Sequence, residues 1–160
     1  MKTLFLIRHA KSSWKYPQLD DHDRPLNGRG ERDRWRMAEY LLERETVIDA
    51  IHSSSAVRAL SLATTLSKVL DVPVSSQSAL YTFAARGLSA YIRRLPDRLD
   101  RAALVGHNPA ITELTNHLTH AGLANVPTSG VVAIDCEVEL WSELSPSVCS
   151  MRYFVAPKLI

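Results

Sequence analysis

Short apolar runs that stop at polar residues recur along the chain. The first extends from Leu4 to Ile7 and ends at Arg8 and His9. Four consecutive apolar residues between polar ones are typical of a strand buried on both faces, as in the middle of a parallel sheet. Runs of the same kind predict further strands at Ile48–His52, Ala102–Val105, Gly130–Glu139 and Val148–Val155, with a short edge strand within Val74–Tyr81.

Segments with apolar residues at helical spacing separate these runs. Asn27 is suited to cap the first helix, which is expected to end near Arg44. The apolar stripe of that helix is expected to consist of Trp35, Ala38, Leu41 and Leu42. Further helices are predicted at about Ala56–Leu70, Gly87–Leu95 and Ala110–His120. The alternation predicts an α/β fold, a three-layer sandwich with helices on both faces of a mainly parallel central sheet.

Composition and charge narrow the range of partners. With 160 residues, of which 46% are hydrophobic, the chain is long enough for one sizeable core and too short for two ordinary domains. Residues 1–160 are therefore expected to form a single domain, acting as a monomer. The 19 Lys and Arg residues nearly balance 17 Asp and Glu residues, so no general polyanion-binding surface is implied and nucleic acid is not an expected partner.

Hydropathy and cysteine usage bear on the compartment. No apolar run approaches the ~18 residues of a membrane span, and Met1–Ile7 is too short for a signal peptide before Arg8 interrupts it. The chain is therefore expected to be cytoplasmic, without a membrane partner. Cys136 and Cys149 match no zinc or redox spacing and are expected to be reduced thiols.

Candidate catalytic residues follow the predicted strands. Arg8 and His9 come directly after the first strand. His107 follows the predicted strand Ala102–Val105, separated from it by a single glycine. Arg58 lies in the first turn of the helix that follows the second strand, where its guanidinium group can reach a phosphate at the helix start. Because parallel strands end at one sheet edge, where such folds bind ligands, these residues are expected to converge. Taken singly, Arg58 is more typical of a helix-surface residue, and His107 is more typical of a capping or buried structural histidine.

The motifs resemble those of a known family. Arg8-His9-Ala10 resembles the Arg-His-Gly signature of the histidine phosphatase superfamily. Together with residues 23–27 (Asp-Arg-Pro-Leu-Asn) and 106–109 (Gly-His-Asn-Pro), it is similar to the SixA branch of phosphohistidine phosphatases, over nearly the whole chain. The resemblance implies a phosphoglycerate-mutase-like fold and a metal-independent phosphatase without a cofactor.

The resemblance also implies roles for individual residues. His9 would be the nucleophile that forms a covalent phosphohistidine, so one ring nitrogen is expected to be unprotonated while the other donates to a fixed acceptor such as a backbone carbonyl. Arg8 and Arg58 would clamp the phosphoryl oxygens. His107 would stabilise the transferring group, best as an imidazolium. The implied substrate-binding residues are Arg8, Arg58, Ser12, His107 and Asn108.

Two departures from the family pattern bear on the substrate. Lys15 stands near the place of an expected Asn, and residues 82–86 carry no acid where mutases and broad phosphatases of the superfamily have a carboxylate proton donor. An alkoxide leaving group needs that proton, whereas phosphohistidine leaves as an imidazole that solvent can protonate. Three loop carboxylates stay open as donors, Asp20, Asp21 and Asp23. Alternatively they are loop charges, with Asp23 paired to Arg24 or Arg58.

These observations leave three hypotheses about function. The leading one is a phosphatase that removes the phosphoryl group from phosphohistidine on a protein. The alternative enzyme is a phosphatase for a small phosphomonoester. A noncatalytic phosphate-binding or phosphoprotein-binding module is favoured by the missing acid and disfavoured by the presence of two histidines and two arginines at the strand ends.

Overall fold

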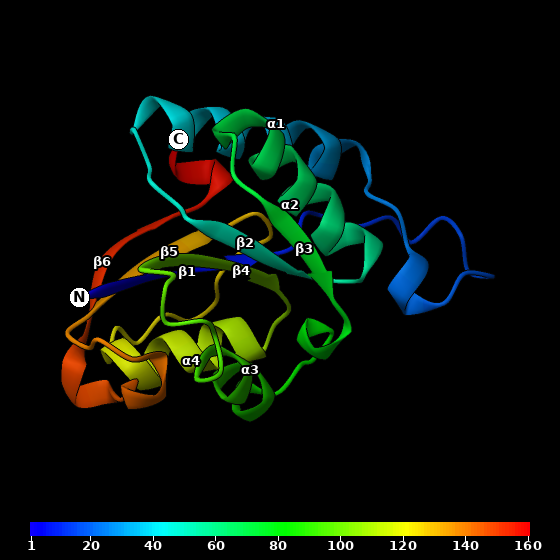
Figure 1. Ribbon diagram of the computed structural model, residues 1–160. Coiled ribbons are helices and arrows are strands. Elements are labelled where there is room, and N and C mark those ends of the chain that lie inside the picture. Colours follow the sequence, from blue (N-terminus) through cyan, green and yellow to red (C-terminus); the bar gives the residue numbers. More distant parts are fainter.

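The computed structural model describes residues 1–160. Its centre is a six-stranded sheet (Figure 1) made of β1 (Lys2–Arg8), β2 (Ala50–Ser54), β3 (Val74–Gln77), β4 (Arg101–Gly106), β5 (Val131–Cys136) and β6 (Cys149–Val155). The strands lie in the order β3-β2-β4-β1-β5-β6. Neighbouring strands are parallel except in the two pairs that involve β5, so the expected mainly parallel sheet is confirmed.

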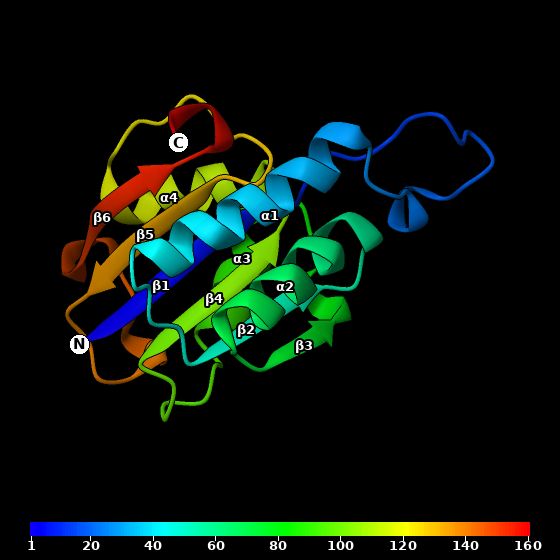
Figure 2. The same ribbon diagram turned by 90° about the horizontal axis from the view of Figure 1, so that it is seen from above.

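Helices cover both faces of the sheet. They are α1 (Gly28–Glu43) and α2 (Val57–Leu70) on one face, and α3 (Ala85–Ile92) and α4 (Ala110–Thr119) on the other (Figures 1 and 2). Side chains of β1 alternate between the two cores, since Leu4 and Leu6 lie in the core with α3 and α4 whereas Phe5 and Ile7 lie in the core with α1 and α2. The three-layer α/β sandwich is therefore confirmed, with β1 buried on both faces.

The buried face of α1 differs from the expected one. Met37, Ala38 and Leu41 are fully buried, whereas Trp35 and Leu42 are 37% and 51% exposed. Both sets of residues have helical spacing, so spacing alone does not distinguish them. The packing of α1 against the sheet and α2 turns the Met37 side inward, and the prediction was wrong for Trp35 and Leu42.

The start of α1 is tied to the first loop, residues 9–27. The Asn27 side chain accepts a hydrogen bond from the backbone N–H of Gly30 at 2.9 Å, which confirms the expected cap. The backbone N–H of Asn27 donates to the Lys11 carbonyl at 3.0 Å. A Cβ atom on Gly30 would overlap this carbonyl, so glycine lets the helix approach the loop closely. Figure 2 shows the rest of the loop, in dark blue, projecting from the body beyond α1.

Two further sequence features can be compared with the fold. No helix is both long enough and apolar enough to cross a membrane. Cys136 and Cys149 are free thiols that face each other across β5 and β6, with their Sγ atoms 3.3 Å apart. Mutual hydrogen bonding and burial raise the pKa of the Cys136 thiol far above its usual range.

Candidate active site

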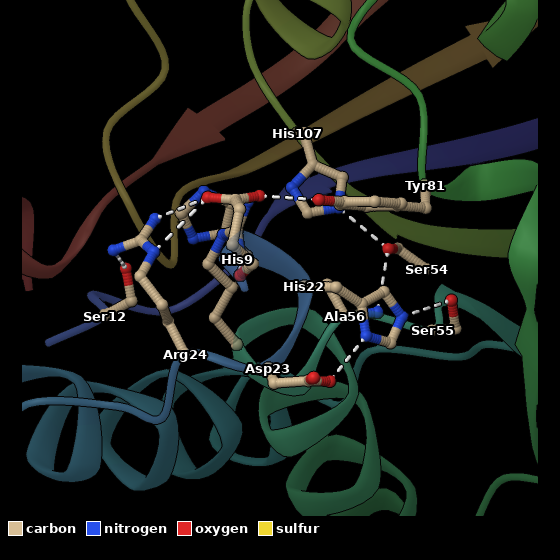
Figure 3. A network of polar contacts seen from close by, with 12 residues as sticks. His9, Ser12, His22, Asp23, Arg24, Ser54, Ser55, Ala56, Tyr81 and His107 are labelled. Carbon is tan, nitrogen blue, oxygen red and sulfur yellow. Dashed lines mark hydrogen bonds and ion pairs between the residues drawn. The ribbon is translucent and has the colours of Figure 1, made fainter. Parts of the chain in front are cut away.

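The parallel pairing of β1 with β4 brings the two histidines together. Arg8 lies opposite Gly106 in the register, and the backbone N–H of His9 donates to the Gly106 carbonyl at 3.0 Å. His9 and His107 are thus the first residues beyond two adjacent strands. Their ring centroids are 5.2 Å apart, with the rings tilted by 45° (Figure 3).

His9 has a defined tautomer. Its Nδ1 lies 2.8 Å from the carbonyl oxygen of Ala10, which can only accept, so the proton is on Nδ1 and Nε2 carries a lone pair. The expected backbone acceptor is confirmed. Burial, together with His107, Arg58 and Arg8, lowers the pKa of His9 to about 3, although the hydrogen bond to Ala10 opposes this shift. His9 is therefore an unprotonated base at neutral pH.

His107 is almost fully buried at the end of β4. Its Nε2 lies 2.7 Å from the hydroxyl oxygen of Ser54, whereas its buried Nδ1 has no partner. Figure 3 shows this second nitrogen on the side of the ring towards His9. Burial and then Arg58 lower the pKa of His107 to about 4. Without a bound anion the ring is thus neutral at neutral pH, because burial and then the positive charge of Arg58 oppose its protonation.

Arg58 and Arg8 supply the positive charge of the site. Arg58 is 2% exposed in the first turn of α2, and its buried Nε has no partner. Arg8 donates to the Val126 carbonyl at 3.1 Å, and its Nε is also buried without a partner. Burial and the charge of Arg58 lower the pKa of Arg8. Two guanidinium groups held close together, with unused donors, are suited to an oxyanion.

Ser12 and Asn108, the two other expected substrate-binding residues, make contacts with the protein. The buried Ser12 hydroxyl accepts a hydrogen bond from Arg24 at 2.7 Å. The Asn108 side chain donates to the Val126 carbonyl at 3.0 Å and accepts from the backbone N–H of Thr112 at 3.1 Å. Asn108 therefore holds the same segment that receives Arg8.

A carboxylate from the first loop also lies in the site, but it belongs to Asp21 rather than to Asp23. Asp21 Oδ2 accepts hydrogen bonds from Arg58 at 2.8 Å and from the Tyr81 hydroxyl at 2.7 Å. Asp23 instead lies 2.9 Å from His22. The short 3₁₀ helix Asp21–Asp23 turns the two carboxylates to different sides. Partial burial opposes ionisation of Asp21, but the bonds from Tyr81, Arg58 and Arg24 outweigh it and hold the carboxyl pKa well below its usual range.

Three residues that surround His107 were not assigned individually from the sequence. Ser54 was interpreted, with its serine neighbours, as a cap of α2, but the N-cap is Ala56, without a side-chain bond. Tyr81 and Phe83 flank His107, with ring centroids 5.3 and 5.1 Å from it. The position of Ser54 at the carboxyl end of β2 was an available signal, and the two aromatic residues belong to the segment Tyr81–Arg86, which the sequence leaves free to fold over the site.

Five cavities of about 390 to 680 Å³ lie away from the two histidines, and none of the five is lined by His9, Arg58 or His107. The largest begins at the amino-terminal ends of β1 and β4, away from the histidines. No group of three His, Cys, Asp or Glu side chains is arranged to hold a metal ion.

Comparison with known proteins assigns the family. A family model described as histidine phosphatase superfamily (branch 1) matches residues 4–86. An uncharacterized protein of Mycobacterium tuberculosis is 30% identical over 163 residues, which cover 95% of this chain and 100% of the relative. The chain therefore belongs to the histidine phosphatase superfamily, whose members include hydrolases of phosphoryl groups.

Solved structures with the same fold include phosphatases of different specificity. A protein assigned as the phosphohistidine phosphatase SixA of Agrobacterium tumefaciens has a TM-score of 0.84, at 25% identity and with 98% of both chains covered. A mycobacterial glucosyl-3-phosphoglycerate phosphatase in complex with VO3 has a TM-score of 0.73, at 14% identity, with 98% of this chain and 100% of that chain covered. The chain is thus SixA-like, with the phosphoglycerate-mutase-like fold, and this fold serves more than one substrate class.

Proposed function

We propose that this chain is a cytoplasmic, metal-independent phosphatase that acts as a monomer on phosphohistidine in proteins, through a covalent phosphohistidine on His9. The observation that carries the proposal is the fixed tautomer of His9. Its Nδ1–H donates to the Ala10 carbonyl, which leaves the lone pair on Nε2. The centroid of this neutral ring lies 5.2 Å from that of His107. A nucleophilic imidazole needs this arrangement.

The proposed reaction has two transfers. Nε2 of His9 attacks phosphorus in line with the P–N bond, which breaks as the substrate imidazole leaves with a proton from solvent. Water then attacks the phosphoryl group on His9, releasing inorganic phosphate and restoring the lone pair. Arg8 and Arg58 stabilise the equatorial oxygens throughout, and His107 donates a hydrogen bond to the transferring group.

The state of the site carboxylate favours a nitrogen leaving group. Asp21 is ionised at neutral pH, because its hydrogen-bond donors hold its pKa below the usual range. It therefore has no proton to give to a departing alkoxide, whereas an imidazole needs none from the protein. The likeness in fold to a protein assigned as SixA agrees with this substrate class.

The test is turnover of four substrates: phosphorylated imidazole, a phosphohistidine peptide, p-nitrophenyl phosphate and glycerol phosphate. We expect the two P–N compounds to be hydrolysed fastest, and an acid-labile phosphoryl group to be trapped on the wild-type chain but not on His9→Ala. Absence of turnover with every substrate would instead favour a noncatalytic binding module.

A phosphatase for a small phosphomonoester is the second candidate. The observation in its favour is the Asp21 carboxylate beside Tyr81. A bound substrate brings further negative charge, which raises the pKa of Asp21 and favours its protonation from solvent. Faster turnover of glycerol phosphate than of phosphorylated imidazole would establish this alternative.

A further inference from the structure

One carboxylate engages the guanidinium group beside the two histidines. Both terminal nitrogens of Arg58 donate to Asp21, one to the backbone carbonyl at 2.7 Å and one to Oδ2 at 2.8 Å. The Tyr81 hydroxyl donates to the same Oδ2 at 2.7 Å. Arg24 donates to Oδ1 from two nitrogens, at 3.0 and 3.3 Å. Both terminal nitrogens of Arg58 are therefore already occupied, one by a carboxylate oxygen and the other by a backbone carbonyl.

A carboxylate and a phosphoryl group compete for such donors. Both present at least two charged oxygens to an arginine fork, which binds them through paired hydrogen bonds, although the carboxylate is planar and the phosphoryl group is tetrahedral. A phosphoryl group held by the terminal nitrogens of Arg58 would lie against the Asp21 carboxylate. Two negative charges in contact repel strongly where water is partly excluded. Binding both anions to Arg58 at once therefore costs electrostatic free energy.

The exposure of the partners indicates which group moves. The side chains of Arg58 and Arg24 are 3% and 10% exposed, whereas that of Asp21 is 45% exposed. Asp21 is also part of the first loop, which projects from the body (Figure 2). Its carboxylate can turn into water without exposing apolar surface, but the two arginines are enclosed by the protein.

We propose that Asp21 is an internal competitor for the phosphoryl-binding end of Arg58. The phosphoryl group of the substrate displaces the carboxylate, and the returning carboxylate helps to expel inorganic phosphate after hydrolysis. Asp21 thus weakens the affinity of the site for phosphate, the product that would otherwise inhibit the enzyme. The inference rests on the proposed function only for the identity of the anion as a phosphoryl group.

The test is the affinity of the full chain for inorganic phosphate, measured by titration calorimetry without turnover. Asp21→Asn keeps the size of the side chain but removes the charge that competes with phosphate. We expect phosphate to bind this variant more tightly than the wild type, by about tenfold or more. Asp23→Asn is the matched control, since it removes the same charge two residues away, where the carboxylate contacts His22 at 2.9 Å instead of an arginine.

The outcomes separate competition from positioning. If Asp21 merely orients Arg58, Asp21→Asn binds phosphate more weakly than the wild type, and the proposal is overturned. It is also overturned if Asp21→Asn and Asp23→Asn change the affinity equally, because the effect is then one of net charge.

A measurement on the wild-type chain covers the case in which Asp21→Asn does not fold. The carboxylate ¹³C resonance of Asp21 should shift as phosphate is added, while that of Asp23 stays in place, and an unmoved Asp21 resonance would overturn the proposal. Phosphate binding as expected, without hydrolysis of phosphohistidine, would contradict the proposed function and leave this inference intact.

Discussion

The hydroxyl oxygen of Ser54 lies 2.7 Å from Nε2 of His107 in a buried contact between β2 and β4. A hydroxyl group both donates and accepts, so Ser54 can partner His107 as a neutral imidazole or as an imidazolium. His107 is neutral at neutral pH, because burial and Arg58 lower its pKa to about 4, and a bound phosphoryl dianion would favour the protonated form. Ser54 therefore suits a histidine that changes its charge during the reaction.

Replacing Ser54 should weaken the action of His107. In Ser54→Ala, Nε2 of His107 is left buried without a partner, which costs on the order of 1 kcal/mol and should lower kcat/KM about fivefold, with an altered pH profile. Ser55→Ala is the control, because that hydroxyl contacts His22 at 2.9 Å and not His107. Equal effects of the two substitutions on the pH profile would contradict this role of Ser54.

The two histidines should have separable roles. His9→Ala should lose both turnover and the trapped phosphoenzyme, because it lacks the attacking nitrogen. His107→Ala should slow transfer by about 3 kcal/mol, as for one lost donor to the transferring group, yet still accumulate some phosphoenzyme. Rapid quench with a labelled phosphoramidate distinguishes the two variants. A phosphoenzyme on His9→Ala would move the nucleophile to another residue.

Acid should destabilise the fold through these histidines. Their pKa values are about 3 for His9 and about 4 for His107, below the unfolded value of 6.5. Below that value the unfolded chain binds protons that the folded chain does not. The contribution of the two histidines to the free energy of unfolding is therefore fully present above pH 6.5. It falls as the pH drops towards the folded pKa values, by at most about 1.4 kcal/mol per pH unit per histidine.

Urea unfolding at a series of pH values checks this dependence. His9→Asn removes one of the two groups, so its stability should fall less steeply over the same acid range. An unchanged slope in that variant would show that His9 does not have the depressed pKa.

The rate should depend steeply on the leaving group. Without a protonated acid, turnover should be fast for phosphorylated imidazole and aryl phosphates and very slow for glycerol phosphate. The first-loop variants Asp20→Asn, Asp21→Asn and Asp23→Asn should each keep this order. If one of them selectively abolishes glycerol phosphate hydrolysis that the wild type performs well, that residue is a proton donor.

The first two glycines of α1 should respond in opposite ways to a methyl group. Gly30→Ala places Cβ against the Lys11 carbonyl, which should destabilise the fold by about 1–3 kcal/mol and displace the loop that carries Asp21. Gly28→Ala meets only the end of Arg32 at 3.4 Å and should stabilise the helix by roughly 0.5–1 kcal/mol. Thermal unfolding compares them, and equal effects would contradict the close approach at Gly30.

The sequence by itself determined the layers of the fold and the place of the histidines. A fully apolar run such as Leu4–Ile7 is stable only when both of its faces are covered, which requires a sheet between helices. Parallel strands then end at one edge, so the residues after β1 and β4 meet without further information. The tautomer of His9 was also predictable, because its acceptor is the carbonyl of the next residue.

Only the tertiary structure decided which side chains surround those histidines. The inward face of α1 depends on how the helix lies on the sheet, so spacing alone misassigned Trp35. Asp21 meets Tyr81 across 60 positions of sequence, and Ser54 meets His107 across 53. The contact of Asp21 with Tyr81 is set by the path of loops whose own residues have weak local preferences, and the contact of Ser54 with His107 is set by the pairing of β2 with β4. The apolar pattern therefore determines where the catalytic histidines lie. Which loop carboxylate binds Arg58, Asp21 or Asp23, depends on the folded path of the first loop.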